Sequence, residues 1–200
     1  MSTSHGSPVV PGPRLIAPSV DLYRAWLEAH AEWGPGVHED GFGLLPSDDV
    51  DSVEGFELWV AWLVASSAGG RDGGCSYRWI VEGGRVLGGI ALRHGDGELV
   101  RKVGDVGCGI RPSARRRGLA TWALGEILAE AREFGMERVL VVCAAENLGS
   151  VRTIERCGGV LEGIRDTELG PARRYWITVG GAARVGPPAG GVLEPAPPTA

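Results

Sequence analysis

Four arginines stand within the short segment Arg111-Pro-Ser-Ala-Arg-Arg-Arg-Gly-Leu-Ala120. An apolar, strand-like run precedes this segment, and a helical pattern follows it. The start of a helix directs unpaired backbone N–H groups and the positive end of the helix dipole at one place, which suits an anion such as a pyrophosphate. Gly118 would let the backbone approach the anion, small Ala120 would leave room for it, and the Thr121 hydroxyl would add a donor. The segment therefore predicts a phosphate-binding loop.

Three other interpretations of the arginine segment have to be weighed. A run of arginines is often no more than a solvated protein face. A nucleic-acid patch is disfavoured, because no aromatic residues interleave with the arginines and the chain has a formal net charge of -5. A Walker phosphate loop is excluded, because the Gly-Lys-Ser/Thr ending is missing. The elements around the segment must therefore decide between a solvated face and an anion site.

The whole chain fits one compact domain. It has 200 residues, of which 44% are hydrophobic and 22% charged, so a sizeable core can form. We expect a flexible N-terminus over residues 1–13, a single folded domain over 14–179 and a disordered, Gly- and Pro-rich tail over 180–200. No run of about 18 apolar residues is present. The start does not resemble a signal peptide, so no membrane contact is expected and a cytoplasmic location is the default.

Apolar periodicity predicts a mixed α/β fold in which helices pack on a central sheet. Ser19 would cap a first helix that ends near Trp33, and Gly135 would end a long helix that begins near Leu119. Gly83-Gly84 suits the tight turn of a hairpin. The predicted strands cover residues 15–17, 77–81, 86–92, 103–110, 139–143, 160–164 and 175–179, a second helix carries Phe56, Trp59, Val60, Leu63 and Val64 on one face, and a short helix carries Leu148, Val151 and Ile154.

The four cysteines do not indicate a metal site. Cys75, Cys108, Cys143 and Cys157 form no Cys-x-x-Cys pair and have no histidine at the spacing of zinc ligands. Cys108 and Cys143 each lie in an apolar, strand-like run, where a thiol packs as a small hydrophobic group. We therefore expect no bound metal.

Two blocks of the sequence resemble the GNAT superfamily of N-acetyltransferases. Arg115-x-x-Gly118-x-Ala120, between a strand and a long helix, looks like the superfamily's acetyl-CoA pyrophosphate signature, Arg/Gln-x-x-Gly-x-Gly/Ala. The strand 139–143, followed by Asn147-x-x-Ser150 and Glu155-Arg156-x-Gly158, looks like its next conserved block, which lies along the pantetheine arm. The resemblance covers about residues 75–179 and is closest to uncharacterised predicted acetyltransferases of this superfamily.

The resemblance implies a mixed, mainly antiparallel sheet of about six to seven strands with helices on both faces, splayed between the strands before and after the loop. Acetyl-CoA would be the co-substrate, with its pantetheine arm in the splay. Gly107 and Gly109 could mark a β-bulge that opens the splay, or could be glycines at the end of a strand. The implied acetyl-CoA site comprises Cys108, Gly109, Ile110, Arg111, Arg115, Arg116, Arg117, Gly118, Leu119, Ala120, Thr121, Asn147 and Ser150.

Acetyl transfer to an amine needs a base, because an amine with a pKa near about 10.4 is mostly protonated at neutral pH. Asp105 and Glu146 are the carboxylates nearest the expected thioester, with Asp105 slightly preferred, although each could be an exposed or structural carboxylate. The superfamily's proton-donating tyrosine, seven positions after the asparagine, is replaced here by Ile154. The leaving thiolate would then be protonated by Cys157, Tyr175, Ser150 or water.

The amine acceptor, a small molecule or a peptide, is not identified by the sequence. Residues 29–70 hold eight acidic residues and no Lys or Arg, which could attract a cationic amine or could form an ordinary solvated loop. Glu39, Asp40, Asp48, Asp49 and Asp51 are the acidic candidates, and Trp33, Trp59 and Trp62 could line an apolar pocket or pack in the core. A CoA-binding sensor without turnover and a nucleic-acid-binding module are the alternative functions. A homodimer also remains open.

Overall fold

The computed structural model describes residues 12–34, 41–67, 74–95, 97–168, 170–180 and 186–188. Seven strands form one sheet in the order β1-β2-β3-β4-β5-β7-β6. Neighbouring strands run antiparallel except β4 and β5, which are parallel. The predicted mixed, mainly antiparallel α/β fold is therefore confirmed. Most of the segments predicted to be flexible, 1–13 and 180–200, lies outside the described residues.

The elements largely match the predicted order, with one helix added. The strands are β1 Arg14–Ile16, β2 Cys75–Glu82, β3 Arg85–Arg93, β4 Val106–Ile110, β5 Arg138–Ala144, β6 Val160–Thr167 and β7 Gly170–Thr178. The helices are α1 Tyr23–Trp33, α2 Val53–Ser66, α3 Glu98–Val103, α4 Leu119–Glu133 and α5 Leu148–Arg156, with short 3-10 turns at η1 Val20–Leu22 and η3 Pro112–Ala114.

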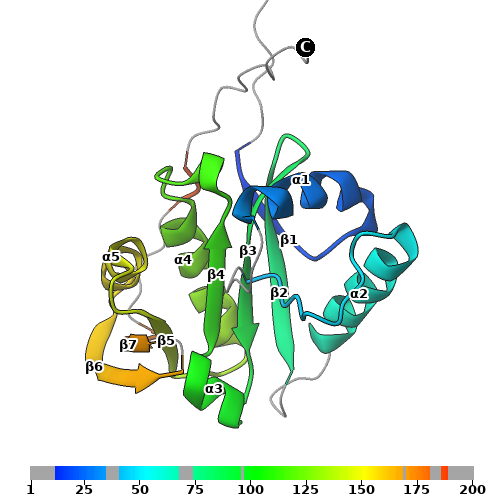
Figure 1. The fold of residues 1–200 in the computed structure, drawn as a ribbon. Coiled ribbons are helices and arrows are strands. Elements are labelled where there is room, and N and C mark those ends of the chain that lie inside the picture. Colours follow the sequence, from blue (N-terminus) through cyan, green and yellow to red (C-terminus); the bar gives the residue numbers. More distant parts are fainter. Residues whose placement is uncertain are drawn as a thin grey trace, which may run out of the picture.

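Helices cover both faces of the sheet (Figure 1). Helices α1 and α2 lie over one face, and α4 lies over the other with α5 beside it. Each face has its own cluster of buried side chains. The α4 side is mainly aliphatic, whereas the α1 and α2 side is aromatic. The aromatic cluster contains Trp26, Phe42, Phe56, Trp59 and Trp79.

Local sequence signals account for the helix ends. The Ser52 hydroxyl accepts a hydrogen bond from the Gly55 N–H at 3.1 Å and so caps α2. Ser19 caps the turn η1, which leads directly into α1. Gly135 follows α4 with a φ of 69°, as expected for a residue that ends a helix. Val64, predicted on the buried face of α2, is exposed instead.

The tryptophans considered for an acceptor pocket occupy different places. Trp59 is buried with its ring centroid 4.8 Å from that of Trp26, so it belongs to the core. Trp33 lies at the edge of the same cluster. Trp62 is 48% exposed on the outer side of α2. The core interpretation therefore holds for Trp59, and Trp62 stays accessible.

The short helix α3 was not predicted, and the strand expected over 103–110 begins later, at Val106. With six residues, α3 has fewer than two turns, too few to show a helical period. Its N-cap is Gly97, which has no side chain to reveal a helix start. Gly104 ends the helix with a φ of 86°, and a Cβ there would lie 2.7 Å from the Leu140 carbonyl oxygen.

The sheet opens into a fork between β4 and β5. These strands pair at Val106↔Val141. Beyond that pair they separate, because β4 stays paired with β3 and β5 stays paired with β7. The expected splay is present, but the expected bulge is not, because β4 pairs with β3 in unbroken register. On the facing strand, Gly88 of β3 is required for space, since a Cβ there would lie 2.2 Å from the Gly109 carbonyl oxygen.

Candidate functional site

The loop between β4 and α4 presents an anion-binding geometry. Gly118 stands at the N-cap of α4 with φ 79° and ψ 3°, in the left-handed region. The backbone N–H groups of Gly118, Leu119, Ala120 and Thr121 have no hydrogen-bond partner among the residues that the structure describes. These donors stand at the positive end of the α4 dipole. The same arrangement commonly holds a phosphate at the start of a helix.

Gly118 is required for its backbone conformation and not for space. A Cβ built on Gly118 would meet no atom within 4 Å, whereas its φ of +79° is rarely adopted by residues with a side chain. Arg116 also has a positive φ, of 64°. The glycine therefore sets the turn that aims the free N–H groups, which refines the expectation that it admits a close approach.

Two of the four loop arginines are paired with carboxylates of the protein itself. Arg111 is buried, and its Nε and Nη2 donate to Glu32 Oε1, the first at 2.7 Å, while its Nη1 donates to the Val86 carbonyl at 3.1 Å. Arg117 Nη2 donates to both oxygens of Glu82 at 2.8 Å. Their guanidinium groups hold the loop to α1 and to the β2–β3 hairpin, so the basic character of the loop is smaller than the sequence indicates.

The other two arginines are exposed. Arg115 Nε donates to the Ile110 carbonyl at 3.0 Å and so braces the loop. The Arg116 side chain has no hydrogen bond or ion pair within the described part of the chain. Arg115 and Arg116 are therefore the side chains best placed to meet phosphate oxygens.

Glu32 is a structural residue of the site that sequence reasoning missed. Besides Arg111, it accepts hydrogen bonds from the backbone N–H and the hydroxyl of Ser113, each at 3.0 Å. Glu32 and Ser113 are 81 residues apart in the sequence, so no local pattern links them. One signal was available, because an acid in the last turn of a helix is unfavourable unless a cation compensates it. Glu32 occupies that position in α1.

Asp105 lies at the closed end of the fork. It is 5% exposed, its Oδ2 accepts from the Leu140 N–H at 2.5 Å, and its own N–H donates to the Leu140 carbonyl at 2.7 Å. Burial raises the pKa of this carboxyl, and the Leu140 hydrogen bond and the Arg93 charge oppose that rise. Asp105 therefore joins β4 to β5, which favours the structural alternative over the role of base.

Asp105→Asn tests this assignment, because the amide oxygen can still accept from the Leu140 N–H. We expect turnover within about threefold of the parent protein, whereas removal of a general base costs about 100-fold or more.

The pH dependence of stability gives a second test of Asp105. Because its pKa is raised in the folded protein, Asp105 stabilises the fold at pH values below its ordinary pKa of 3.8. This contribution is lost as the pH rises through the folded-state pKa. The free energy of unfolding of the parent minus that of Asp105→Asn, measured with urea between about pH 3 and pH 7, should therefore decline as the pH rises.

Asp105→Ala is the matched control. It leaves the Leu140 N–H buried without an acceptor and should cost about 1–3 kcal/mol of stability. If Asp105→Asn unfolds normally but has lost turnover by about 100-fold, Asp105 is the base after all.

The second block surrounds α5. Asn147 caps this helix, because its Oδ1 accepts from the Ser150 N–H at 3.1 Å. Glu146 is exposed just after β5 and remains a candidate base. Ile154, at the position of the family tyrosine, is 2% exposed and packs in the aliphatic cluster. The roles predicted for Asn147, Ser150 and Glu146 in binding and catalysis stay predictions.

The candidate proton donors near α5 are buried. Cys157 Sγ lies 3.5 Å from the Thr121 carbonyl oxygen, and burial raises the pKa of its thiol. The Tyr175 hydroxyl lies 3.4 Å from Glu155 Oε1. The same burial disfavours the thiolate that proton donation would leave, so Cys157 is a weaker acid than an exposed thiol, and its role as donor stays a prediction.

The acidic candidates for acceptor binding are partly engaged in local structure. Asp49 accepts from the Ser52 hydroxyl at 2.6 Å, and Asp48 accepts from the Leu45 N–H at 2.8 Å. These contacts shape the turn before α2. Glu39 and Asp40 lie outside the described residues. The ordinary-loop interpretation is therefore favoured for Asp48 and Asp49.

Two kinds of feature are absent from the described ranges. No group of three or more His, Cys, Asp or Glu side chains that could hold a metal ion occurs there. In that same part of the chain, no helix has the length and apolarity needed to cross a membrane.

Comparisons with known proteins agree with the fold. The family model described as "Acetyltransferase (GNAT) domain" matches residues 18–160. A comparison with curated proteins gives no match. Among solved structures, an acetyltransferase from Salmonella typhimurium that modifies the N-terminal serine of ribosomal protein L7/L12 has a TM-score of 0.63 at 15% identity, covering 86% of this chain and 97% of that one.

Two further structures contain the coenzyme. Mycobacterium smegmatis RimJ in complex with CoA-disulfide has a TM-score of 0.62 at 17% identity, with 85% of this chain and 87% of that chain covered. The microcin C7 self-immunity acetyltransferase MccE, in complex with acetyl-CoA and AMP, has a TM-score of 0.63 at 14% identity, with 88% and 97% covered. The family match spans well over half of the chain, and the forked sheet agrees with it. The chain therefore belongs to the GNAT family of acetyltransferases, and it is an acyltransferase enzyme.

Proposed function

We propose that this enzyme transfers the acetyl group of acetyl-CoA to a primary amine of a small molecule or a peptide. The observation that carries the proposal is the junction of the β4–β5 fork with a helix start whose N–H groups at Gly118 to Thr121 are unpaired among the described residues. A pyrophosphate at the helix start would leave the pantetheine arm directed into the fork. The coenzyme thus has both an anion site and a path to the centre of the sheet.

The fork suits the pantetheine arm because of backbone chemistry. Beyond Val106, β4 makes no further strand pair with β5 in the described part of the chain. Pantetheine carries two amide groups, which can bond such an edge in the manner of an added strand. The thioester would then lie near the middle of the fork, where a backbone N–H can polarise its carbonyl oxygen.

The reaction at that point is direct acyl transfer. The acceptor nitrogen loses a proton to a base or to water and attacks the thioester carbon. The tetrahedral intermediate then collapses, the C–S bond breaks, and the CoA thiolate takes up a proton. Cys157, Tyr175, Ser150 and water are the candidate donors, and the burial that raises the pKa of the Cys157 thiol disfavours Cys157 among them.

A peptide amine is one acceptor class that deserves the first test, because the similar Salmonella typhimurium enzyme modifies the N-terminal serine of a ribosomal protein. Release of free CoA thiol from acetyl-CoA should be measured with a panel of peptide N-termini and small primary amines. Mass spectrometry of the product should show one added acetyl group on nitrogen.

A CoA-binding sensor without turnover is the second candidate, because Ile154 replaces the family tyrosine and packs in the core. Strong thermal stabilisation by CoA together with silence across the whole amine panel would favour the sensor and count against the transferase.

Arg116→Ala and Arg117→Ala should separate binding from stability. Arg116 is exposed, so its loss should weaken CoA about tenfold with little change in folding. Arg117→Ala leaves Glu82, which is 6% exposed, without its cation. That change should lower stability by about 1–3 kcal/mol and affect CoA affinity less. Calorimetric titration with CoA and urea unfolding measure the two effects, and a larger CoA defect in the Arg117 variant would reverse the assignment.

A further inference from the structure

We propose that Cys108 and Cys143 form a redox-sensitive thiol pair across the β4–β5 fork, whose oxidation to a disulfide closes the fork against CoA. The inference concerns regulation of the same site and therefore rests on the proposed function. It combines three observations: the register of the two strands, the face on which both thiols lie, and their distance along the chain from the last strand pair.

The register places the two cysteines opposite each other. The last pair between β4 and β5 is Val106↔Val141, and the strands are parallel. Two residues further along β4 is Cys108, and two residues further along β5 is Cys143. Equal steps along parallel strands preserve the pairing position. Cys108 and Cys143 are therefore at matching positions on the two strands of the fork, two residues beyond the last strand pair.

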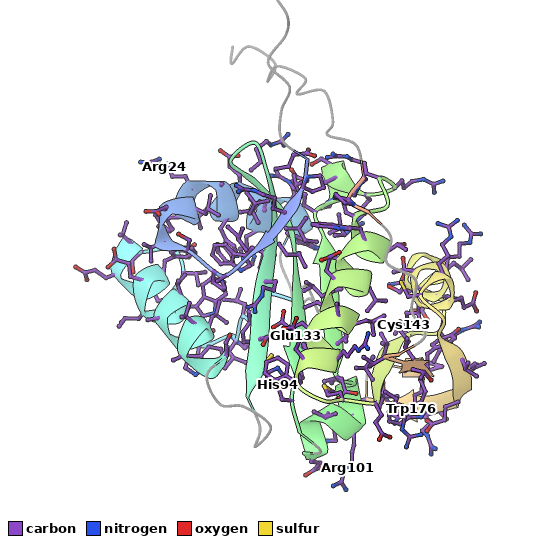
Figure 2. All side chains as sticks on the ribbon, turned by 180° about the vertical axis from the view of Figure 1, so that it is seen from behind. Arg24, His94, Arg101, Glu133, Cys143 and Trp176 are labelled. Atoms are coloured by element: carbon purple, nitrogen blue, oxygen red, sulfur yellow. The ribbon has the colours of Figure 1, made fainter. Side chains whose placement is uncertain are left out.

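Both thiols lie on the same face of the sheet. Side chains alternate along a strand, so Cys108 shares the face of Val106 and Cys143 shares that of Val141. Val106 and Val141 belong to the aliphatic cluster beneath α4 and α5, and Cys108 and Cys143 pack against this cluster. Figure 2 shows Cys143 on this side of the molecule, beside α5. Both cysteines are reduced thiols and only partly buried, so a small reagent can reach them.

The geometry near the vertex suits a disulfide. Neighbouring strands are about 4.8 Å apart where they pair, and a disulfide joins Cα atoms that are about 4.4–6.8 Å apart. Cys108 and Cys143 each lie two residues beyond Val106 and Val141, which is about 7 Å along the strand. An inward movement of the two strands to the Cα spacing of a disulfide would bring the sulfur atoms together, and the bond would occupy the space that the pantetheine arm needs.

A low-molecular-weight disulfide, such as glutathione disulfide, is the oxidant. One cysteine thiolate attacks its S–S bond, forms a mixed disulfide and expels one glutathione thiolate. The second cysteine thiolate then attacks the protein sulfur, forms the Cys108–Cys143 bond and expels the second glutathione. The protein loses two electrons and two protons, and glutathione disulfide gains them as two thiols.

The test uses the full-length protein, reduced and then incubated with glutathione disulfide at about pH 8.5. An alkaline pH is chosen because burial raises the pKa of the Cys143 thiol, as do Glu146 and Glu155, against the opposing charge of Arg173. Peptide mapping without reduction should show Cys108 joined to Cys143. Calorimetric titration should show CoA affinity lowered at least about tenfold, and dithiothreitol should restore it.

Cys143→Ala and Cys75→Ser are the informative variants. Cys143→Ala cannot form the cross-link, so its CoA affinity should be the same before and after the oxidant. Cys75→Ser removes another partly buried thiol, on β2, and should respond to the oxidant like the parent. Bound CoA should slow cross-linking of the parent, because the pantetheine arm would separate the strands.

The outcomes separate this proposal from the proposed function. If CoA stabilises the reduced protein but the oxidant leaves Cys108 and Cys143 open to alkylation, the thiol pair is refuted and the transferase stands. A cross-link that leaves CoA affinity unchanged refutes the closure of the fork. If the cross-link forms and even the reduced protein ignores CoA, the CoA site is wrong while the thiol pair stands.

Discussion

Glu32→Ala should lower the free energy of unfolding by about 3 kcal/mol, because it leaves a buried guanidinium without its counter-charge. Arg111 is 4% exposed, and Glu32 accepts two of its hydrogen bonds. The variant also frees the N–H and hydroxyl of Ser113. In a chain of this length such a loss lowers Tm by roughly 6–12 °C. Urea unfolding followed by circular dichroism measures the free energy directly.

Glu28→Ala is the control, since Glu28 is an exposed acid one turn earlier on the same helix. It should change stability by no more than about 0.5 kcal/mol. The double variant Glu32→Ala/Arg111→Met should recover part of the loss, because no charge remains buried. Equal stability of the Glu32 and Glu28 variants would show that the ion pair does not hold the loop to α1.

Glu32 also gives the fold a defined acid sensitivity. Burial by itself would raise the pKa of Glu32, but the hydrogen bonds from Arg111 and Ser113 outweigh it and hold the pKa below its ordinary value of 4.5. A carboxyl with a lowered folded-state pKa stabilises fully above the unfolded value, and the contribution disappears as the pH falls through the folded value. Glu32→Gln should therefore have a lower free energy of unfolding than the parent near neutral pH. Below about pH 4.5 this free energy should change less with pH than that of the parent.

Gly118→Asp should weaken CoA binding by at least about 100-fold, the largest effect expected at the loop. The carboxylate would stand where the pyrophosphate is expected and would repel it, and it would compete for the N–H groups at the start of α4. The positive φ of Gly118 adds a cost of about 1 kcal/mol for any side chain. Calorimetric titration with CoA and the CoA-induced shift in Tm measure the change.

Gly118→Asn is the matched control, because asparagine has the shape of aspartate, tolerates the left-handed region equally and carries no charge. Its affinity for CoA should fall no more than about tenfold. The difference between the two variants isolates the electrostatic part of the effect. If both bind CoA like the parent, the start of α4 is not the pyrophosphate site.

Elements with a long, regular pattern were predictable from the sequence. The stripe from Ala120 to Phe134 predicted a helix that the structure places at Leu119–Glu133, and the apolar run 139–143 predicted β5. The helix α3 escaped prediction because six residues starting after a glycine show neither a period nor a cap. The bulge expected at Gly107 and Gly109 was wrong, because β4 pairs with β3 in unbroken register and a glycine in a strand does not by itself produce a bulge.

The sequence by itself determined the loop, its glycine and the order of strands and helices around it, because these depend on neighbours within a few turns of the chain. Only the tertiary structure decided how the four arginines divide, because Glu32 and Glu82 reach Arg111 and Arg117 from 79 and 35 residues away. The same holds for Asp105, which meets Leu140 only when β4 and β5 come together. Long-range pairing of charges leaves no local pattern, so the sequence shows a basic loop where the fold leaves two arginines exposed.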